Sequence, residues 1–160
     1  MTETHQPPMK NGSPDDFQTP EIALDYLIPF LNKYWTIWEC ACGKGNLVNG
    51  LIKRGFEVIG TDKINGFNFL IDKPVQWDCI VTNPPFSIKE KFLERCYQLG
   101  TPFALLLPLT ALESEKRQKL YRRYGIQLII PNKRINFETP SGRGGKLVCN
   151  CLVLWKYEFT

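Results

Sequence analysis

The residues best suited to chemistry are Asn83-Pro84-Pro85-Phe86, which follow the apolar run Cys79-Ile80-Val81-Thr82. The apolar run predicts a buried strand, and two consecutive prolines force the chain to leave it in an extended turn. The turn holds the Asn83 amide, the Pro84 carbonyl and the Phe86 ring close together. Amide and carbonyl oxygens accept the N–H bonds of an exocyclic amino group, and a heterocycle stacks on an aromatic ring. A strand-ending turn with a buried phenylalanine is the structural alternative.

A second motif, Glu39-Cys40-Ala41-Cys42-Gly43-Lys44-Gly45-Asn46, stands between a predicted strand at 36–38 and a predicted helix at 46–54. Its glycines permit positive φ angles and close approach of a ligand to the backbone. Asp62 ends the next predicted strand, nineteen residues beyond Gly43 (62 − 43). An acid at this distance is typical of folds that bind the hydroxyl pair of a ribose.

The order of predicted elements favours an α/β fold, a Rossmann-like, mostly parallel sheet with helices on both faces. Apolar runs predict further strands at 103–107, 127–130 and 147–155, and helical spacing of apolar residues predicts helices at 88–98 and 113–124. No helix separates the last two strands, so we expect them to pair antiparallel. The carboxyl ends of the strands would then carry Glu39, Asp62 and Asn83 to one cleft.

The N-terminal residues 1–16 are rich in proline and polar residues and predict a flexible tail, which leaves 17–160 as one domain. Thr19 is a candidate cap for a first helix that would have Pro20 at its first position. No apolar run reaches the ~20 residues of a membrane span, and the polar start does not resemble a signal peptide. These features predict a cytoplasmic protein with no membrane partner.

The six cysteines include two Cys-x-Cys pairs, Cys40/Cys42 and Cys149/Cys151. Zinc sites usually use Cys-x-x-Cys spacing on turns, whereas Cys149 and Cys151 lie in a strand pattern. The spacing therefore favours free thiols in a reducing compartment and no metal site.

The net charge of +4 is modest, but the basic residues are concentrated in two segments. One contains Lys116, Arg117, Lys119, Arg122 and Arg123, and the other contains Lys133, Arg134, Arg143 and Lys146. Two such segments favour a polyanionic partner, and a solvated helix face is the alternative for the first.

The two motifs together resemble those of the class I S-adenosylmethionine-dependent amino-methyltransferases, and the resemblance covers roughly residues 17–157. Within that family the chain most resembles the small stand-alone DNA adenine-N6 methyltransferases of phages and prophages. The resemblance implies the class I methyltransferase fold, with an antiparallel final strand, and S-adenosylmethionine as cofactor. It implies transfer of a methyl group to an exocyclic amino nitrogen of a base, and the catalytic residues Asn83, Pro84, Pro85 and Phe86.

The resemblance also implies the residues that bind the cofactor. Gly43 and Gly45 would admit it, Asp62 would accept from its ribose hydroxyls, and Thr19 would lie over its methionine end. Asn68 stands where the family commonly has an aspartate that accepts from the adenine of the cofactor. The full implied set is Thr19, Glu39, Cys40, Ala41, Gly43, Gly45, Asn46, Asp62, Lys63, Asn68, Phe69 and Asn83.

Similar loops in the family pack against the target base, which must be flipped out of a duplex or already single-stranded. Phe137 is then a candidate second wall for the base, opposite Phe86, and a buried anchor for the loop is the alternative. The implied substrate-binding residues are Phe86, Lys133, Arg134, Phe137 and Arg143.

Four functions remain open from the sequence. DNA is the favoured substrate, and RNA, methylated at adenine N6 or guanine N2, is the first alternative. A protein-glutamine methyltransferase is a second, although these enzymes usually have a tyrosine where Phe86 stands. The third is a non-catalytic nucleic-acid-binding subunit. The chain has no long insertion for reading a duplex sequence, so a partner subunit could supply recognition.

Overall fold

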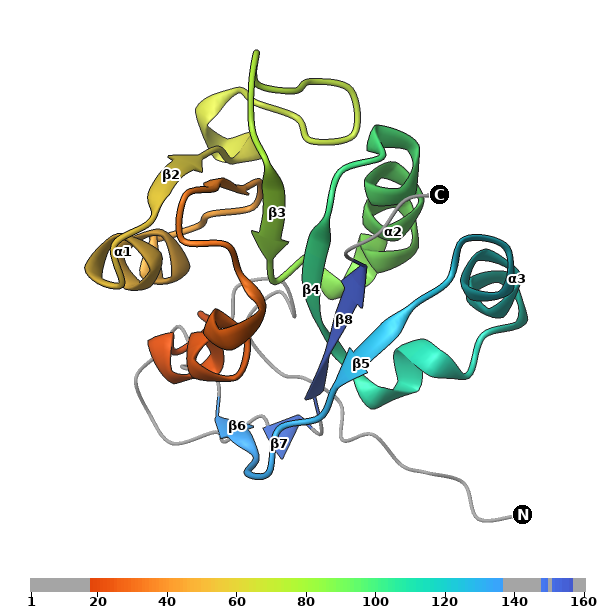
Figure 1. Ribbon diagram of the computed structural model, residues 1–160. Coiled ribbons are helices and arrows are strands. Elements are labelled where there is room, and N and C mark those ends of the chain that lie inside the picture. Colours follow the sequence, from red (N-terminus) through yellow and green to blue (C-terminus); the bar gives the residue numbers. More distant parts are fainter. Residues whose placement is uncertain (1–17, 137–147, 150, 157–160) are drawn as a thin grey trace.

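A six-stranded sheet organises the protein, of which the computed structural model describes residues 18–136, 148–149 and 151–156 (Figure 1). The strand order is β2-β1-β3-β4-β8-β5. The bounds are β1 Thr36–Glu39, β2 Glu57–Gly60, β3 Cys79–Thr82, β4 Phe103–Pro108, β5 Gln127–Ile129 and β8 Cys151–Lys156. The pairs β1–β2, β1–β3 and β3–β4 are parallel, while β8 lies antiparallel between β4 and β5. The mostly parallel sheet predicted from the sequence is confirmed.

The strands at the centre of the sheet are buried along their whole apolar runs. All four residues of β3 are buried, and so are residues 103–107 of β4. Parallel strands that are covered on both faces need continuous apolar sequence, which explains why these two runs show no alternation. At the edge, β2 exposes Glu57 and Gly60.

One face of the sheet is covered by α1 (Asn46–Lys53) and the 3-10 helix η2 (Glu21–Tyr26). Three ion pairs connect η2 to the end of α1: Lys53 with Glu21 and Arg54 with Asp25, each at 2.7 Å, and Arg54 with Glu21 at 3.7 Å. Gly50 permits the close approach, because a Cβ atom there would lie 2.8 Å from a methyl group of Leu24.

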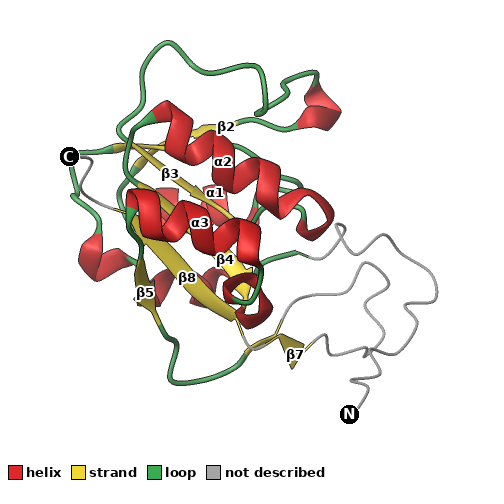
Figure 2. Ribbon diagram, turned by 90° about the vertical axis from the view of Figure 1, so that its right-hand side faces the viewer, coloured by secondary structure: helices red, strands yellow, loops and turns green. Residues whose placement is uncertain are grey.

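The opposite face is covered by α2 (Lys89–Leu99) and α3 (Glu115–Tyr124), which Figure 2 shows lying next to each other over the sheet. Because neighbouring residues of a strand point to opposite faces, Ile37 packs under α1 and Trp38 packs under α2. The predicted helices on both faces are confirmed.

The first helix differs from the prediction. η2 and the following η3 (Ile28–Phe30) are 3-10 helices, and η2 is capped by Pro20 with no side-chain hydrogen bond. Pro29 explains part of this, since its missing N–H and its ring interrupt an α-helix one turn upstream. The predicted capping role of Thr19 is therefore wrong.

Smaller differences lie at the ends of elements. The predicted strand at 147–155 is two strands: β7 (Val148–Cys149) pairs with β6 (Ile135–Asn136), while β8 joins the main sheet. Further 3-10 turns are η4 (Lys63–Asn65), η5 (Phe86–Ile88) and η6 (Leu109–Leu112). The predicted tail at 1–16 lies outside the described residues. Within the described part of the chain, no helix has the length and apolar character to cross a membrane.

The central position of β4 gives a stability prediction. Leu105 is fully buried, so Leu105→Ala should lower the free energy of unfolding by about 2–5 kcal/mol through lost burial and a cavity. Leu128→Ala on the edge strand β5, where the leucine is 42% exposed, is the control and should cost about 0.5 kcal/mol. Urea denaturation measures both, and equal losses would contradict the central placement of β4.

Candidate active site

Asn83 follows β3 directly, and its side-chain amide contacts the segment that leads into η2. The Nδ2 group donates a hydrogen bond to Oγ1 of Thr19 at 2.7 Å. The Oδ1 atom is buried and has no hydrogen-bond partner among the described residues. A buried acceptor without a partner costs about 1–3 kcal/mol, so such an atom marks a place where the donor of a ligand would fit.

The two prolines form the extended turn expected from the sequence. Pro84 is buried, and Pro85 has φ −54° and ψ 124°. Phe86 is half-buried and begins η5, where the Lys89 ammonium donates to its backbone carbonyl at 3.2 Å. The turn therefore places an amide and an aromatic ring at the end of the same buried strand.

The glycine turn after β1 is tight, and both of its glycines have positive φ angles, 49° at Gly43 and 88° at Gly45. Asp62 holds the turn, since its Oδ2 accepts from the Gly43 N–H at 2.8 Å and its Oδ1 accepts from the Ile64 N–H at 3.0 Å. The predicted closeness of the glycines and the strand-ending acid is thus present. Each carboxylate oxygen keeps a further lone pair for another donor.

Glu39 links this turn to the end of β3. The residue is 1% exposed, and its Oε1 accepts from the Ala41 N–H at 3.0 Å and from the hydroxyl of Thr82, the residue before Asn83. Burial raises the pKa of Glu39 to about 7, which the two hydrogen bonds oppose and the nearby charge of Asp62 supports. The Glu39 carboxyl therefore makes hydrogen bonds inside the protein that connect the end of β1 with the end of β3.

Sequence reasoning missed two residues of this region. Thr82 is the polar residue of the run 79–82, and that position in a buried strand was a usable signal. Gln18 lies over the glycine turn, where its Oε1 accepts from the Lys44 N–H at 3.4 Å and lies 3.4 Å from where a Cβ of Gly43 would be. Nothing local in the sequence distinguishes Gln18.

Other predicted cofactor residues bury their side chains or use them internally. Cys40 is 2% exposed, and burial raises the pKa of its thiol. Phe69 is 2% exposed, with its ring centre 5.2 Å from that of Trp38 and 4.6 Å from that of Phe92. The Asn68 side-chain oxygen accepts from the Leu70 N–H at 3.1 Å. The side chains of Cys40 and Phe69 are therefore part of the core.

The remaining predicted cofactor residues lie at the starts of elements around the glycine turn. Ala41 follows β1 and is half-buried, as is Asn46, the first residue of α1. Lys63 is exposed at the start of η4. These residues border the turn, and the Ala41 N–H is the donor to Glu39.

The basic residues of α3 are largely paired within the protein. Lys116 pairs with Glu94 at 2.9 Å, and Lys119 pairs with Glu115 at 3.1 Å. Arg117 is 8% exposed, pairs with Glu90 at 2.7 Å and donates to the Ala111 carbonyl at 2.7 Å. These three cations neutralise carboxylates of the protein itself, which favours the solvated-face alternative for this segment. Arg122 and Arg123 are exposed.

The second basic segment begins with Lys133 and Arg134, both exposed on the loop before β6. Ile135, 2% exposed, anchors this loop in the core beneath η2, and Tyr26 of η2 donates to Asn132 at 3.1 Å. The loop is therefore fixed to the same helix that follows Thr19. Phe137, Arg143 and Lys146 lie outside the described residues.

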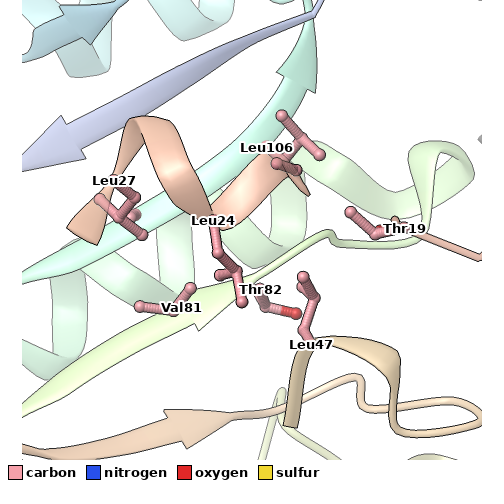
Figure 3. A pocket seen from close by; sticks show the side chains of 9 residues that line it. Thr19, Leu24, Leu27, Leu47, Val81, Thr82 and Leu106 are labelled. Carbon is pink, nitrogen blue, oxygen red and sulfur yellow. The ribbon is translucent and has the colours of Figure 1, made fainter. Parts of the chain in front are cut away.

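A small cavity of about 20 Å³ lies between η2, α1 and the sheet (Figure 3). Thr19 and Thr82 line one part of it, and the rest is apolar: Ala23, Leu24, Leu27, Leu47, Val81, Ala104 and Leu106. Its volume holds a single water molecule and not a nucleoside. The cavity is a packing gap beneath the N-terminal segment.

The described cysteines Cys40, Cys42, Cys79 and Cys96 are free, and all but Cys42 are buried. The side chains of Cys149 and Cys151 lie outside the described part. Among the side chains that the structure describes, no three histidine, cysteine or acidic residues are grouped as a metal site would require.

Comparison with known proteins identifies the fold. No family model and no curated protein sequence matches the chain. A candidate RNA methyltransferase, PH1948 from Pyrococcus horikoshii, is similar in structure, with a TM-score of 0.64 and 14% identity over 91% of this chain and 88% of that one. A candidate class I S-adenosylmethionine-dependent methyltransferase from Listeria monocytogenes has a TM-score of 0.59 and 14% identity over 93% of this chain and 63% of that one.

A dimethyladenosine transferase from Plasmodium falciparum has a TM-score of 0.54 and 15% identity over 87% of this chain. This chain spans 61% of that enzyme. At these identities the likeness concerns the fold, which is the class I methyltransferase fold predicted from the sequence.

The raised pKa of Glu39 gives a prediction about stability and pH. Between its ordinary pKa of 4.5 and about 7, the folded protein keeps a proton that the unfolded chain has released. The contribution of Glu39 to the free energy of unfolding therefore falls as the pH rises through that window. Relative to wild type, Glu39→Gln should gain stability between about pH 5 and pH 7, by about 3 kcal/mol, because glutamine does not titrate.

Urea denaturation across this pH range measures the difference between wild type and variant. Glu57→Gln, at an exposed position of the neighbouring strand β2, is the matched control and should show a flat difference. A flat difference for Glu39→Gln as well would mean that Glu39 does not titrate in this window.

Proposed function

We propose that this protein transfers a methyl group from S-adenosylmethionine to an exocyclic amino nitrogen of a nucleic-acid base, with adenine N6 in DNA as the favoured target. The observation that carries the proposal is the buried Oδ1 of Asn83, which has no partner among the residues that the structure describes and follows a strand next to β1 and its glycine turn. An acceptor of this kind needs an N–H donor, and an exocyclic amino group brings two.

The residues present fit S-adenosylmethionine. Gly43 and Gly45 have no side chains and adopt positive φ angles, which suits a turn whose backbone a ligand approaches, and the lone pairs that remain on Asp62 suit the two hydroxyls of a ribose. When bound, S-adenosylmethionine supplies an electrophilic methyl group. The protein's task is to hold the acceptor nitrogen in line with that group and to exclude water.

The chemical difficulty lies in the amine. The lone pair of adenine N6 is delocalised into the ring, so this nitrogen is a weak nucleophile. When Asn83 Oδ1 and the Pro84 carbonyl accept its two N–H bonds, a pyramidal nitrogen with a localised lone pair is favoured. As the new N–C bond forms and the bond from the methyl group to the sulfonium sulfur would break, positive charge grows on the nitrogen, and both oxygens then bind it more strongly, which lowers the barrier. The methylated nitrogen then releases one proton to solvent, which restores the neutral amine.

Phe86 is the stacking surface for the base in this proposal, and Lys133 and Arg134 are the described cations that would meet the phosphates. A base inside a duplex does not reach a strand-end pocket, so the substrate is single-stranded or its base is flipped out. RNA is the alternative substrate, and the likeness to a candidate RNA methyltransferase favours it. The partner and the cellular compartment that we expect, nucleic acid in the cytoplasm, belong to the same proposal.

One experiment tests the reaction and the substrate together. The purified protein is incubated with S-adenosylmethionine labelled in its methyl group and with DNA, RNA and protein separately, and mass spectrometry then identifies the methylated product. We expect N6-methyladenine in DNA. A methylated RNA base would show that RNA is the substrate. Methylated glutamine would show that the substrate is a protein and not a nucleic acid, and no product from any substrate would refute the proposal.

The catalytic assignment of Asn83 gives a second prediction. Asn83→Ala should lower turnover by about 10²-fold or more, because it removes an acceptor that strengthens in the transition state. Cofactor binding, measured by calorimetry, should be nearly unchanged in this variant.

Two further variants complete the comparison. Asp62→Ala should weaken the binding of S-adenosylmethionine, which Asn83→Ala leaves nearly unchanged. Gln98→Ala, at an exposed amide on α2, is the control and should change neither turnover nor cofactor binding. Full turnover in Asn83→Ala would remove Asn83 from the reaction.

A further inference from the structure

Thr19 and Asn83 are 64 positions apart in the sequence, yet their side chains share a hydrogen bond in the candidate site. Thr19 is 5% exposed, and its Oγ1 accepts from Asn83 Nδ2 at 2.7 Å. The hydroxyl does not cap η2, whose N-terminus has no side-chain hydrogen bond. The contact to Asn83 is therefore what the structure shows this buried hydroxyl doing.

The contact matters because an asparagine amide has two ends of nearly equal size and opposite character. Its oxygen accepts hydrogen bonds, whereas its NH₂ group only donates them. A target amine needs the oxygen. If the Asn83 amide were turned by 180°, its own NH₂ group would face the NH₂ group of the target, and no hydrogen bond could form. The Nδ2 end of Asn83 donates to Thr19, and the buried Oδ1 end has no partner within the described ranges.

The segment that carries Thr19 is held on both sides. Before it, Gln18 accepts from the Lys44 N–H on the glycine turn at 3.4 Å. After it, Ala23 and Leu24 of η2 are buried in the core beside the sheet. Thr19 is thus fixed by the rest of the structure, and it can orient a partner without moving itself.

We propose that Thr19 is a positioning residue, which holds the Asn83 amide so that its oxygen faces the target amine. This rests on the proposed function, since it assigns how the acceptor of that reaction is kept in orientation. This role differs from binding of the cofactor, because the Thr19 hydroxyl contacts the side chain of Asn83. Removal of the contact leaves the amide free to rotate and reduces the fraction of molecules in the competent orientation.

Thr19→Val tests this, since valine keeps the shape of threonine and removes the hydroxyl. We expect kcat to fall by about tenfold, as for the loss of one hydrogen bond, with KM for nucleic acid and Kd for S-adenosylmethionine unchanged. Thr19→Ser should restore kcat, because it restores the hydroxyl.

Thr101→Val is the matched control. Thr101 accepts from the Trp77 ring N–H at 2.9 Å at the beginning of β4, away from the carboxyl end of β3, so its variant loses the same kind of bond without affecting kcat. Unchanged kcat in Thr19→Val would overturn the proposal. A weakened Kd for S-adenosylmethionine with unchanged kcat would overturn it in favour of a cofactor contact.

A second measurement does not depend on activity. The side-chain amide signals of Asn83 in ¹H–¹⁵N spectra, assigned by their loss in Asn83→Ala, should shift in Thr19→Val and return in Thr19→Ser. Unshifted signals in Thr19→Val would refute the contact. If wild type methylates nothing, the proposed function fails, and these signals still decide whether Thr19 orients Asn83.

Discussion

The neighbouring strands β2, β1 and β3 are parallel, so their carboxyl ends lie side by side. The candidate site depends on this constraint. Backbone pairing in register brings the residues that follow these strands together, although they are far apart in the sequence. Asp62 then reaches the glycine turn, and Glu39 reaches the residue before Asn83. The hydrogen bonds between β1 and β3 therefore hold the motif at 83–86 beside the glycine turn, and the two together form the candidate site.

The buried polar groups at these carboxyl ends differ in how well their hydrogen bonds are satisfied. Glu39 is fully buried, and the Ala41 N–H and the Thr82 hydroxyl satisfy its oxygen, so it strengthens the junction of two strands. The oxygen of Asn83 is buried with no partner in the described part of the molecule, so it costs stability. A fold keeps such a cost where a ligand removes it, and this difference is the reason that we propose Asn83 as the group that contacts the substrate.

The charges show that closeness in sequence does not define a binding surface. Lys116 and Arg117 of α3 face α2 and pair with its Glu94 and Glu90. The Arg117 guanidinium is almost fully buried and donates to the Ala111 carbonyl, so it supports the turn η6. Lys133 and Arg134 remain exposed on a loop that is anchored beneath η2. Lys116, Arg117 and Lys119, three of the five cations in the first basic segment, are therefore engaged by carboxylates of the protein itself.

The sequence by itself determined the α/β class, the buried strands β3 and β4, the helices α1, α2 and α3 to within a few residues, and the two motifs of the candidate site. These features follow from local signals, such as periodicity, proline and glycine. Only the tertiary structure decided that Thr19 contacts Asn83, that Thr82 contacts Glu39, that Phe69 is buried and that α3 pairs with α2. It also decided that the first helix is a 3-10 helix packed on α1. The physical reason is that these features depend on contacts between distant segments, and the free energy of such contacts leaves no local pattern in the sequence.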